Sequence, residues 1–412
     1  MIRVEEAIER ILSHVHPLGL EKVSILEALG RVIAEDAVAP RDLPPYDNSG
    51  MDGYAVRSVD VQKASEQNPV SLIIIEDLRA GFFAKNALQE GQAIRIMTGA
   101  PVPAGADAVV PVEETRSDGR SVSIRKSVRP GDFIRRAGED VKQGDRVITH
   151  GEVIRPSEVG MLASIGKPFV LVYRRPVVAI LCTGEELVDV GEPLEGAKIV
   201  SSNSYTLAAQ VKECGAVPMQ LGIARDDKEE IKRKLLQGLQ ADVFISSAGV
   251  SVGDYDFVRE ALKELGAQLI FWRVAMKPGK PVAFWQYDGK PVFSLPGNPV
   301  SSMVTFEQFV RPALLKMMGH GQLFRPVIEA ILAEEIRKEP GKRHFIRGVV
   351  SYGPEGYSVK TTGPQGSGIL RSMVRANGLI ILPEDREGVK EGERVKVQLL
   401  YPPEFVGSGP LK

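Results

Sequence analysis

The sequence has few cysteines, no long apolar run and almost no net charge. Cys182 and Cys214 are the only cysteines in 412 residues, too few to staple the fold, so we expect a reducing, cytoplasmic location. No stretch approaches the 18 apolar residues of a membrane helix, and residues 1–15 have the spacing of an amphipathic helix. The formal net charge is -1. We therefore expect neither a nucleic-acid partner nor a membrane partner.

Two common ligand-binding motifs are also missing from the sequence. Its five histidines are scattered, and none forms an H-x-x-x-H or H-E-x-x-H pair, which argues against a zinc site. No G-x-x-x-x-G-K-[ST] phosphate-binding loop occurs either. Any anion site must therefore be built locally, from other loops of the chain.

The pattern of apolar residues predicts several domains. Residues from about 70 to 150 alternate short β-like runs with Gly and Pro turns, which indicates a β-domain. From residue 176 to 325, solid apolar runs end in glycine turns and alternate with helices, as is typical of a doubly wound parallel α/β sheet. Residues from 326 onward return to a β pattern. Before the β-domain, we expect a short helix that ends near Gly30.

The stretch "PVFSLPGNPVSS" (291–302) ends one predicted strand and begins a helix. Asn298 suits the N-cap, and Pro299 suits the first helical position because its missing N–H is not needed there. Free backbone N–H groups at such a helix start also favour a bound anion. A structural cap and an anion site are both compatible with the sequence here.

In an open parallel sheet, ligands bind beyond the carboxyl ends of the strands. Here those ends are the loops 183–187, 246–256, 277–281 and 296–302. The serines and glycines of "SSAGVSVGDYD" (246–256) can bring backbone N–H groups against a phosphate, although a plain turn is the simpler interpretation. Lys277 and Lys280 flank a tight turn and either clamp an anion or are merely solvated.

Several acids follow the same strands, among them Glu185, Glu186, Asp226 and Asp227. One interpretation is that they only cap helices. Next to a phosphate, however, each would be repelled by about 4 kcal/mol at 4 Å and an effective dielectric near 20. The site therefore either holds no phosphate or contains a divalent cation, for which oxygen ligands and phosphate together favour Mg²⁺.

The chain resembles the MoeA family of molybdopterin molybdenumtransferases, which includes the gephyrin E domain and its plant counterpart. The resemblance rests on seven motifs that occur in the family's order over nearly the whole chain: "DNSGMDGYAVR", "RIMTGAPVPAGADAVVPVE", "TGEELV", "SSAGVSVGDYD", "KPGKP", "LPGNPVSS" and "TTGPQGS". The chain departs from the family at Ala248, where glycine is usual, and at Gly368, where histidine is common.

The resemblance implies a multidomain α/β plus β fold and four domains. Residues 1–45 and 140–175 would form an elongated, discontinuous N-terminal domain used for dimerisation, and residues 46–139 a β-rich domain. Residues 176–325 would form a central MogA-like α/β domain that binds molybdopterin, and residues 326–412 a small, barrel-like β domain.

The resemblance also implies the last step of molybdenum cofactor synthesis. Adenylylated molybdopterin and molybdate would be the substrates, the adenylate would be hydrolysed in a Mg²⁺-dependent reaction, and AMP would leave. It further implies a homodimer, a MogA-type adenylyltransferase as upstream partner and molybdoenzyme apoproteins as downstream partners. The sequence leaves open whether molybdate or tungstate is the natural ion.

Matching the family's motifs residue by residue implies a set of site residues. Asp52 and Thr98 would reach the cleft from the partner subunit. The functional acids and Mg²⁺ ligands would be Glu186, Asp226 and Asp256. Substrate would be bound by Ser247, Gly249, Ser251, Gly253, Lys277, Lys280, Pro296, Gly297, Asn298, Pro299, Arg347 and Ser367.

Two other functions remain open at this point. The α/β domain alone also resembles the MogA-type adenylyltransferase, although the extra β domains argue against that activity. A non-catalytic scaffold or cofactor carrier is the second alternative, which the gephyrin relative shows is possible.

Overall fold

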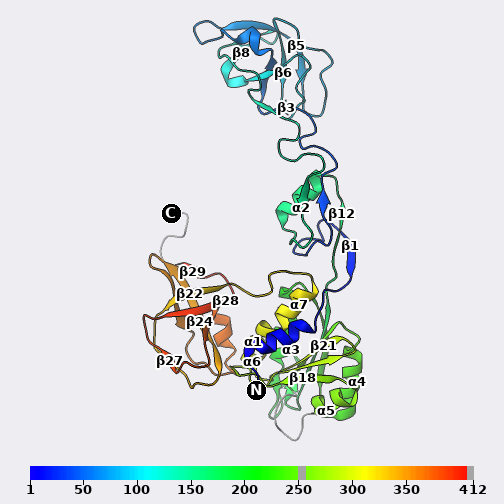
Figure 1. Cartoon of the computed structure of the whole chain (residues 1–412), viewed down its shortest axis with the longest axis vertical. Helices are drawn as coiled ribbons and strands as arrows, with labels where there is room; N and C mark the ends of the chain where they lie inside the picture. The colour runs from blue at the N-terminus through cyan, green and yellow to red at the C-terminus, as the bar shows by residue number, and fades with distance from the viewer. Residues whose placement is uncertain (249–256, 406–412) are drawn as a thin grey trace. The chain divides into compact units, whose positions relative to one another are not determined.

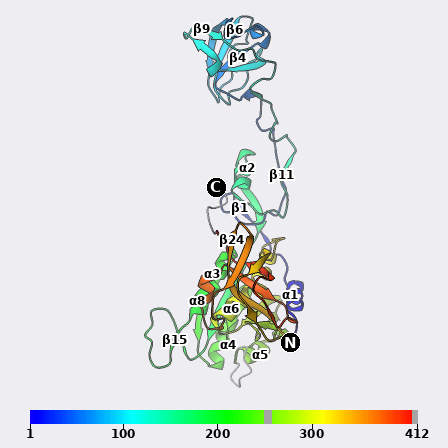
Figure 2. The same ribbon diagram turned by 90° about the vertical axis from the view of Figure 1, so that its left-hand side faces the viewer.

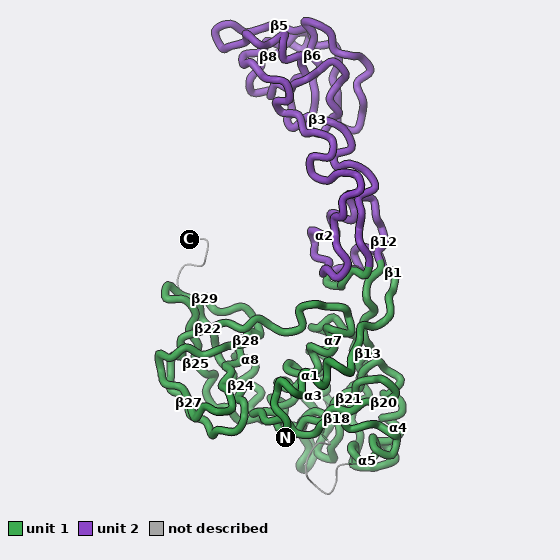
Figure 3. Tube along the Cα trace, viewed as in Figure 1, with its two compact units in different colours: residues 1–22, 30–34, 171–412 green, residues 23–29, 35–170 purple. Residues whose placement is uncertain are grey.

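The computed structural model describes residues 1–248 and 257–405, and the chain forms two compact units (Figure 3). The first unit comprises residues 1–22, 30–34 and 171–412, and the second comprises residues 23–29 and 35–170. β1 (Leu20–Ser24) and β12 (Phe169–Tyr173) lie where the chain passes between units. Among the described residues, no helix combines the length and apolar character that a membrane crossing needs.

The second unit contains a six-stranded mixed sheet with the order β7-β4-β6-β5-β9-β8 (Figure 2). Its strands are β4 (Gly53–Val56), β5 (Val70–Leu78), β6 (Gln92–Ile96), β7 (Ala108–Pro111), β8 (Thr115–Ser117) and β9 (Ser121–Ile124). Successive residues of a strand face opposite sides, and both sides are buried here: Tyr54 and Val56 pack into one apolar cluster and Ala55 into another. The predicted β-domain is therefore present.

Shorter elements complete the second unit. They are β2 (Ala37–Val38), which pairs with β11 (Arg146–Ile148), β3 (Asn48–Ser49), which pairs with β10 (Ile134–Arg135), the 3₁₀ turns η1 (Ser58–Val61) and η2 (Val112–Glu114), and α2 (Pro156–Ser164). The helix expected before Gly30 is wrong, because residues 25–30 form turns. The Glu27 carboxylate accepts hydrogen bonds from the Ser24 N–H and hydroxyl, and Leu26 and Leu29 are exposed, so a helix would have no apolar face to bury.

The first unit contains a six-stranded sheet with the order β16-β13-β17-β21-β20-β18 (Figure 1). The strands are β13 (Val177–Thr183), β16 (Val217–Ala224), β17 (Val243–Ser247), β18 (Gln268–Trp272), β20 (Ala283–Tyr287) and β21 (Lys290–Leu295). β16, β13, β17 and β21 run parallel, as predicted, whereas β20 pairs antiparallel with both β21 and β18 at one edge. Asp288 and Gly289, both with positive φ, join β20 to β21, and Asp-Gly is a signal for this hairpin turn.

Helices cover both faces of this sheet. One face carries α1 (Val4–Ser13), α3 (Ser202–Glu213), α6 (Pro299–Thr305), the π-helical segment η3 (Phe306–Val310) and α7 (Arg311–Met317). The other face carries α4 (Lys228–Gly238) and α5 (Phe257–Glu264). Alternate residues of β13 serve the two layers, since Val178 packs with the first set and Ala179 with the second. The doubly wound architecture expected from the sequence is confirmed. The loop between β13 and α3, which carries β14 (Leu187–Val188) and β15 (Ile199–Val200), extends away from these layers (Figure 2).

A closed barrel follows the α/β domain in the same unit. Its five strands are β22 (Val327–Leu332), β24 (Arg343–Gly353), β25 (Gly356–Thr361), β26 (Gly378–Leu382) and β28 (Arg394–Leu399). The pairing of β24 with β26 closes the ring, and Val350, Val359 and Val397 fill it. Short elements flank it: β23 (Ile336–Arg337), β27 (Gly388–Val389), β29 (Glu404–Phe405) and α8 (Arg371–Arg375). The barrel-like C-terminal fold is thus present.

The barrel and the α/β domain are joined by a strand pair and a shared core. β19 (Met276–Lys277) pairs in parallel with the start of β24, so that Lys277 lies opposite His344. Phe345 and Leu379 of the barrel belong to the same apolar cluster as Met276 and Phe306. This junction fixes the two walls of the site described next.

Candidate active site

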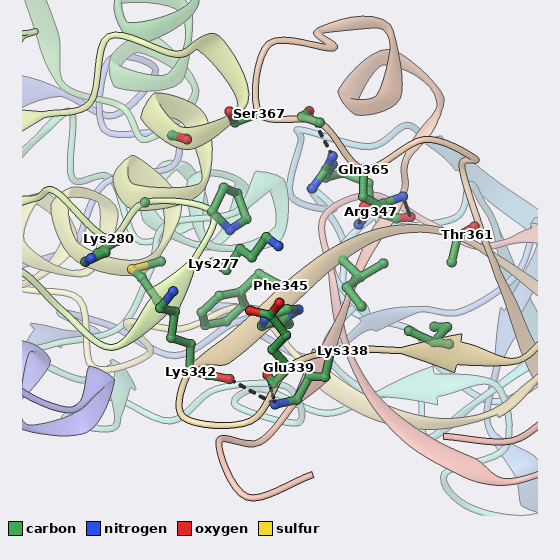
Figure 4. Close-up of a pocket in the computed structure, with 18 of the residues that line it drawn as sticks. Lys277, Lys280, Lys338, Glu339, Lys342, Phe345, Arg347, Thr361, Gln365 and Ser367 are labelled. Carbon is green, nitrogen blue, oxygen red and sulfur yellow. Dashed lines mark hydrogen bonds between the residues drawn. The ribbon is translucent and has the colours of Figure 1, made fainter. Parts of the chain in front are cut away.

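A cavity of about 1000 Å³ lies between the α/β domain and the barrel (Figure 4). Its charged lining is mostly basic. Six lining residues carry positive charge, Lys277, Lys280, Arg337, Lys338, Lys342 and Arg347, and three carry negative charge, Glu334, Glu335 and Glu339. Because Arg337 and Glu335 pair with each other at 2.8 Å, the remaining excess of positive charge favours an anionic ligand.

The α/β wall of this cavity presents the two predicted lysines. Both Lys277 and Lys280 are exposed, and neither side chain makes a hydrogen bond or an ion pair within the described part of the chain. Between them, Gly279 has a φ of 105°, and a Cβ there would lie 2.4 Å from Cγ2 of Thr305. The glycine therefore allows the turn to pack on α6 while both ammonium groups remain available to a ligand.

The barrel wall presents a buried guanidinium. Arg347 is 1% exposed, and its Nε and Nη2 atoms donate to the Ser372 hydroxyl at 3.1 Å and the Gly366 carbonyl at 3.2 Å. No carboxylate pairs with it among the described residues, and burial alone lowers the pKa of Arg347 to about 10. The group stays charged at neutral pH, and a buried charge without a counter-ion is costly unless a ligand supplies one.

Ser367 lines the same cavity, and its carbonyl occupies one of the backbone N–H groups at the start of α6 that were expected to bind an anion. Its carbonyl accepts the backbone N–H of Val300 at 3.1 Å, and Pro299 has no N–H to offer. Asn298 occupies the N-cap position but its side chain makes no capping bond. The helix start thus offers fewer free donors than the sequence suggested, whereas the Asn298 side chain remains available to a ligand.

A second cavity of about 450 Å³ adjoins the first, since Asn298 and Pro281 line both. The predicted residues Ser247, Pro296, Gly297, Pro299 and Glu186 line it as well. Asn203, which the sequence reading missed, donates from Nδ2 to the Ser247 hydroxyl at 2.8 Å and the Gly297 carbonyl at 2.7 Å. It ties together the ends of β17 and β21, which form the floor of this cavity.

Ala248 lines the smaller cavity in a backbone conformation that suits glycine. Its φ is 79°, in the left-handed region, and its N–H donates to the Leu295 carbonyl at 3.0 Å. A residue with a Cβ is strained there, which gives a physical reason for the glycine that is usual in the family. The rest of this loop, including Gly249, Ser251, Gly253 and Asp256, lies outside the described residues.

Three carboxylates gather at the ends of β13 and β16. Partial burial and the charges of Glu185 and Glu186 raise the pKa of Asp226. The backbone N–H of Asp226 donates to Glu185 Oε1 at 3.1 Å. Asp227 has a different task, since it caps α4 by accepting the Glu230 N–H at 2.7 Å. Mutual repulsion of this kind suits a cation held by oxygen ligands. These carboxylates do not converge tightly enough to form a metal site by themselves, since no group of three potential metal ligands occurs within residues 1–248 and 257–405.

Asp52 and Thr98 lie together in the second unit. Asp52 Oδ1 accepts both the backbone N–H and the hydroxyl of Thr98, each at 2.7 Å. These two bonds lower the pKa of Asp52 and keep it ionised at neutral pH. Both residues are exposed. The sequence motifs that contain them did not predict this contact.

The structure therefore groups most of the predicted residues and adds others. Lys277, Lys280, Asn298, Arg347 and Ser367 line one cavity. The sequence reading missed Lys338, Lys342 and His344, which also line it, although the basic run "KEPGKRH" (338–344) was a visible signal.

Three family models match consecutive parts of the chain. They are "MoeA N-terminal region (domain I and II)" at residues 2–166, "Probable molybdopterin binding domain" at residues 179–316, and "MoeA C-terminal region (domain IV)" at residues 329–400.

Known proteins match over nearly the whole length. Molybdopterin molybdenumtransferase 2 of Mycobacterium tuberculosis is 41% identical over 381 residues, which cover 91% of this chain and 94% of that protein. Molybdopterin molybdenumtransferase of Haemophilus influenzae is 36% identical over 407 residues, 97% of this chain and 98% of that protein. The crystal structure of the molybdopterin biosynthesis protein MoeA from Pyrococcus horikoshii OT3 has a TM-score of 0.81 and 34% identity, and covers 97% of this chain and 100% of that chain.

Proposed function

This chain belongs to the MoeA family, and we propose that it is a molybdopterin molybdenumtransferase that inserts molybdate into adenylylated molybdopterin with release of AMP. The observation that carries the proposal is the buried guanidinium of Arg347, which has no carboxylate partner among the described residues and shares a cavity with Lys277 and Lys280.

The substrates of this reaction are rich in negative charge. Adenylylated molybdopterin contains a phosphoanhydride, and molybdate is a tetrahedral oxyanion. The planar guanidinium of Arg347 can donate two parallel hydrogen bonds to such a group, while Lys277 and Lys280 act as point charges. Arg347 and the two lysines come from opposite walls of the cavity, so an oxyanion between them is held from two sides (Figure 4).

The two adjoining cavities suit a long substrate. We assign the anionic groups to the larger, basic cavity and the neighbouring part of the pterin–nucleotide to the smaller one, whose floor is formed by Ser247 and Gly297. Asn298, which lines both, would hydrogen-bond the substrate where it passes between them. Asn203 would keep this floor in place through its two hydrogen bonds.

The acids Glu186 and Asp226, with Asp256, would hold Mg²⁺. When bound, Mg²⁺ supplies charge neutralisation and polarises the phosphoanhydride toward cleavage. The raised pKa of Asp226 supports this assignment, because a cation would relieve the repulsion from Glu185 and Glu186. The role of these three acids would be to supply ionised carboxylate oxygens directed at the cation.

We also propose a cytoplasmic homodimer in which Asp52 and Thr98 complete the cleft of the other subunit. Their hydrogen-bonded pair, exposed in the second unit, supports a role at a surface rather than in a core. A MogA-type adenylyltransferase would supply the adenylylated substrate, and apoproteins of molybdoenzymes would accept the product.

The test is to mix the purified protein with adenylylated molybdopterin and Mg²⁺, add molybdate or tungstate, and measure AMP. We expect AMP release that depends on the oxyanion and on Mg²⁺, and the faster oxyanion identifies the natural one. A parallel reaction with molybdopterin and ATP examines the adenylyltransferase alternative. Formation of the adenylate there, without AMP release in the first reaction, would overturn the proposal.

A further inference from the structure

His344 lies in the wall of the larger cavity, outside the residues that the proposed function uses. Its side chain is 8% exposed, and its partner across the β19–β24 pair is Lys277. Within the described part of the chain, its ring nitrogens make no hydrogen bond. An imidazole with unused donor and acceptor capacity therefore stands beside one of the anion-binding lysines.

Charged groups surround this imidazole on the neighbouring elements. They are Lys277 on β19, Lys338 and Glu339 after β23, Lys342 just before β24, Arg343 on β24, and Glu384 and Asp385 after β26. Glu384 is engaged by Arg343 at 3.1 Å. The Lys338 ammonium donates to the carbonyls of Lys342 and Glu339, which holds it at this end of the cavity.

Positive charge dominates the balance at His344. Burial, followed by Lys338, Lys277 and Lys342, lowers the pKa of His344 to about 4. The ring is therefore neutral at pH 7, because burial and the three ammonium groups around it both disfavour its protonation. A bound anion with two negative charges would offset these ammonium charges. Burial would then be the only remaining factor that disfavours protonation of His344.

We propose that His344 is a proton-coupled binding residue for a tetrahedral oxyanion. The imidazole is neutral in the free protein and accepts one proton from solvent when a dianionic oxyanion binds beside Lys277. The protonated ring then donates a hydrogen bond to the oxyanion. This inference rests on the proposed function, because it takes the cavity as the place where the substrates' oxyanions bind. The oxyanion is molybdate itself or the phosphate of AMP, both of which are tetrahedral dianions at neutral pH.

The direct test is an NMR titration of the full-length protein labelled with ¹³C at histidine Cε1. Only five histidines are present, and the signal of His344 is assigned by its loss in His344→Gln. In the free protein we expect this signal to titrate below about pH 5. Saturating sodium molybdate, or AMP in a separate sample, should raise its midpoint by at least about one pH unit.

His320 is the matched control for this titration. Burial and Arg311 also lower its pKa, but it does not line the cavity. Its signal should keep the same midpoint in the presence of either ligand. A shift for molybdate alone assigns the site to the metal oxyanion, and a shift for AMP alone assigns it to the nucleotide phosphate.

Proton uptake must also appear in the affinity, because the coupling between two binding events is reciprocal. If the bound-state pKa returns to the ordinary value, wild-type protein should bind the active oxyanion about tenfold more tightly at pH 5.5 than at pH 8. His344→Gln should abolish this pH dependence, and His320→Gln should retain it. A merely structural role for His344 would instead weaken binding equally at every pH.

Three results would overturn the inference. They are an unmoved His344 signal with bound ligand, an unchanged pH dependence in His344→Gln, and no binding of either ligand by the wild-type protein. The AMP-release assay stands apart from these measurements. A wild-type enzyme that releases AMP but shows no proton uptake refutes only the role of His344, whereas proton uptake without AMP release refutes only the proposed function.

Discussion

At the residue scale, the site depends on one buried charge, Arg347, that has no carboxylate partner among the described residues. Arg347 is buried on β24, and its two side-chain hydrogen bonds go to neutral groups, Ser372 and Gly366. By contrast, Arg325 pairs with two carboxylates, Glu307 at 3.0 Å and Glu213 at 2.9 Å. The difference distinguishes an arginine that joins domains from one that is available to a ligand.

Replacement of this guanidinium should weaken oxyanion binding more than it weakens the fold. Loss of a charged hydrogen bond costs about 1.5–3 kcal/mol, so we expect Arg347→Met to raise the KM for molybdate about tenfold to a hundredfold. The free energy of unfolding should change by less than about 1 kcal/mol, because an uncompensated buried charge is removed as well. AMP-release kinetics and urea unfolding measure the two quantities.

The control for this variant is Lys360→Met, which removes one positive charge from an exposed position on β25 that does not line the cavity. Its KM for molybdate should equal that of the wild type. An equal rise of KM in both variants would show that only the overall charge matters, and would remove Arg347 from the site.

The depressed pKa of His344 has a consequence for stability. The unfolded chain protonates this residue near pH 6.5, whereas the folded protein does so near pH 4. Between these values the unfolded state binds the extra proton, so stability falls as the pH is lowered through this window. We expect the wild type to lose about 2 kcal/mol more than His344→Gln between pH 7.5 and pH 4.5. Urea unfolding of both proteins at the two pH values measures this difference, and parallel losses would contradict it.

At the scale of single elements, the N-cap residues of α4 and α6 have different roles. Asp227 caps α4, since its carboxylate accepts the Glu230 N–H. Asn298 occupies the same position before α6 but caps nothing and lines both cavities. The sequence identifies both as N-caps and cannot separate them, because the difference depends on where Ser367 places its carbonyl.

Substitution by alanine should separate the two roles. We expect Asp227→Ala to cost about 1 kcal/mol of unfolding free energy, as the loss of a helix cap usually does. Asn298→Ala should cost less than about 0.5 kcal/mol and should instead raise the KM for adenylylated molybdopterin. The reverse order of stabilities, measured by urea unfolding, would show that Asn298 acts as a cap after all.

Elements with strong local signals could be predicted from the sequence. The apolar runs that became β13, β17 and β21 end in glycine turns, and Pro299 begins α6 as expected. The antiparallel pairing of β20 with β21 was not predicted, although Asp288-Gly289 is a typical sequence signal for a hairpin turn. The helix predicted before Gly30 failed because local spacing says nothing about whether Leu26 has a surface to pack against.

The candidate site was predictable only in part, because it combines distant segments. The lysines at 277 and 280 and the acids at 186 and 226 follow strand ends, which sequence patterns locate. The approach of Lys338, Lys342 and His344 depends on the register of β19 against β24, more than 60 residues apart in the chain. No local pattern encodes such a register.

At the scale of the whole molecule, the account requires residues from two subunits in each cleft. Asp52→Ala and Lys280→Ala should each abolish AMP release as homodimers. Mixed dimers, made by unfolding and refolding the two variants together, should recover part of the activity, because one of their two clefts is intact. Mixed dimers that form, as native mass spectrometry would show, but stay inactive would place both residues in the same subunit's cleft.

The most direct test of the central claim is to locate the oxyanion. A crystal of this protein soaked in sodium tungstate and measured at the tungsten absorption edge should show an anomalous peak within hydrogen-bond distance of Arg347 and of Lys277 or Lys280. A fully occupied peak elsewhere, with none in this cavity, would contradict the account.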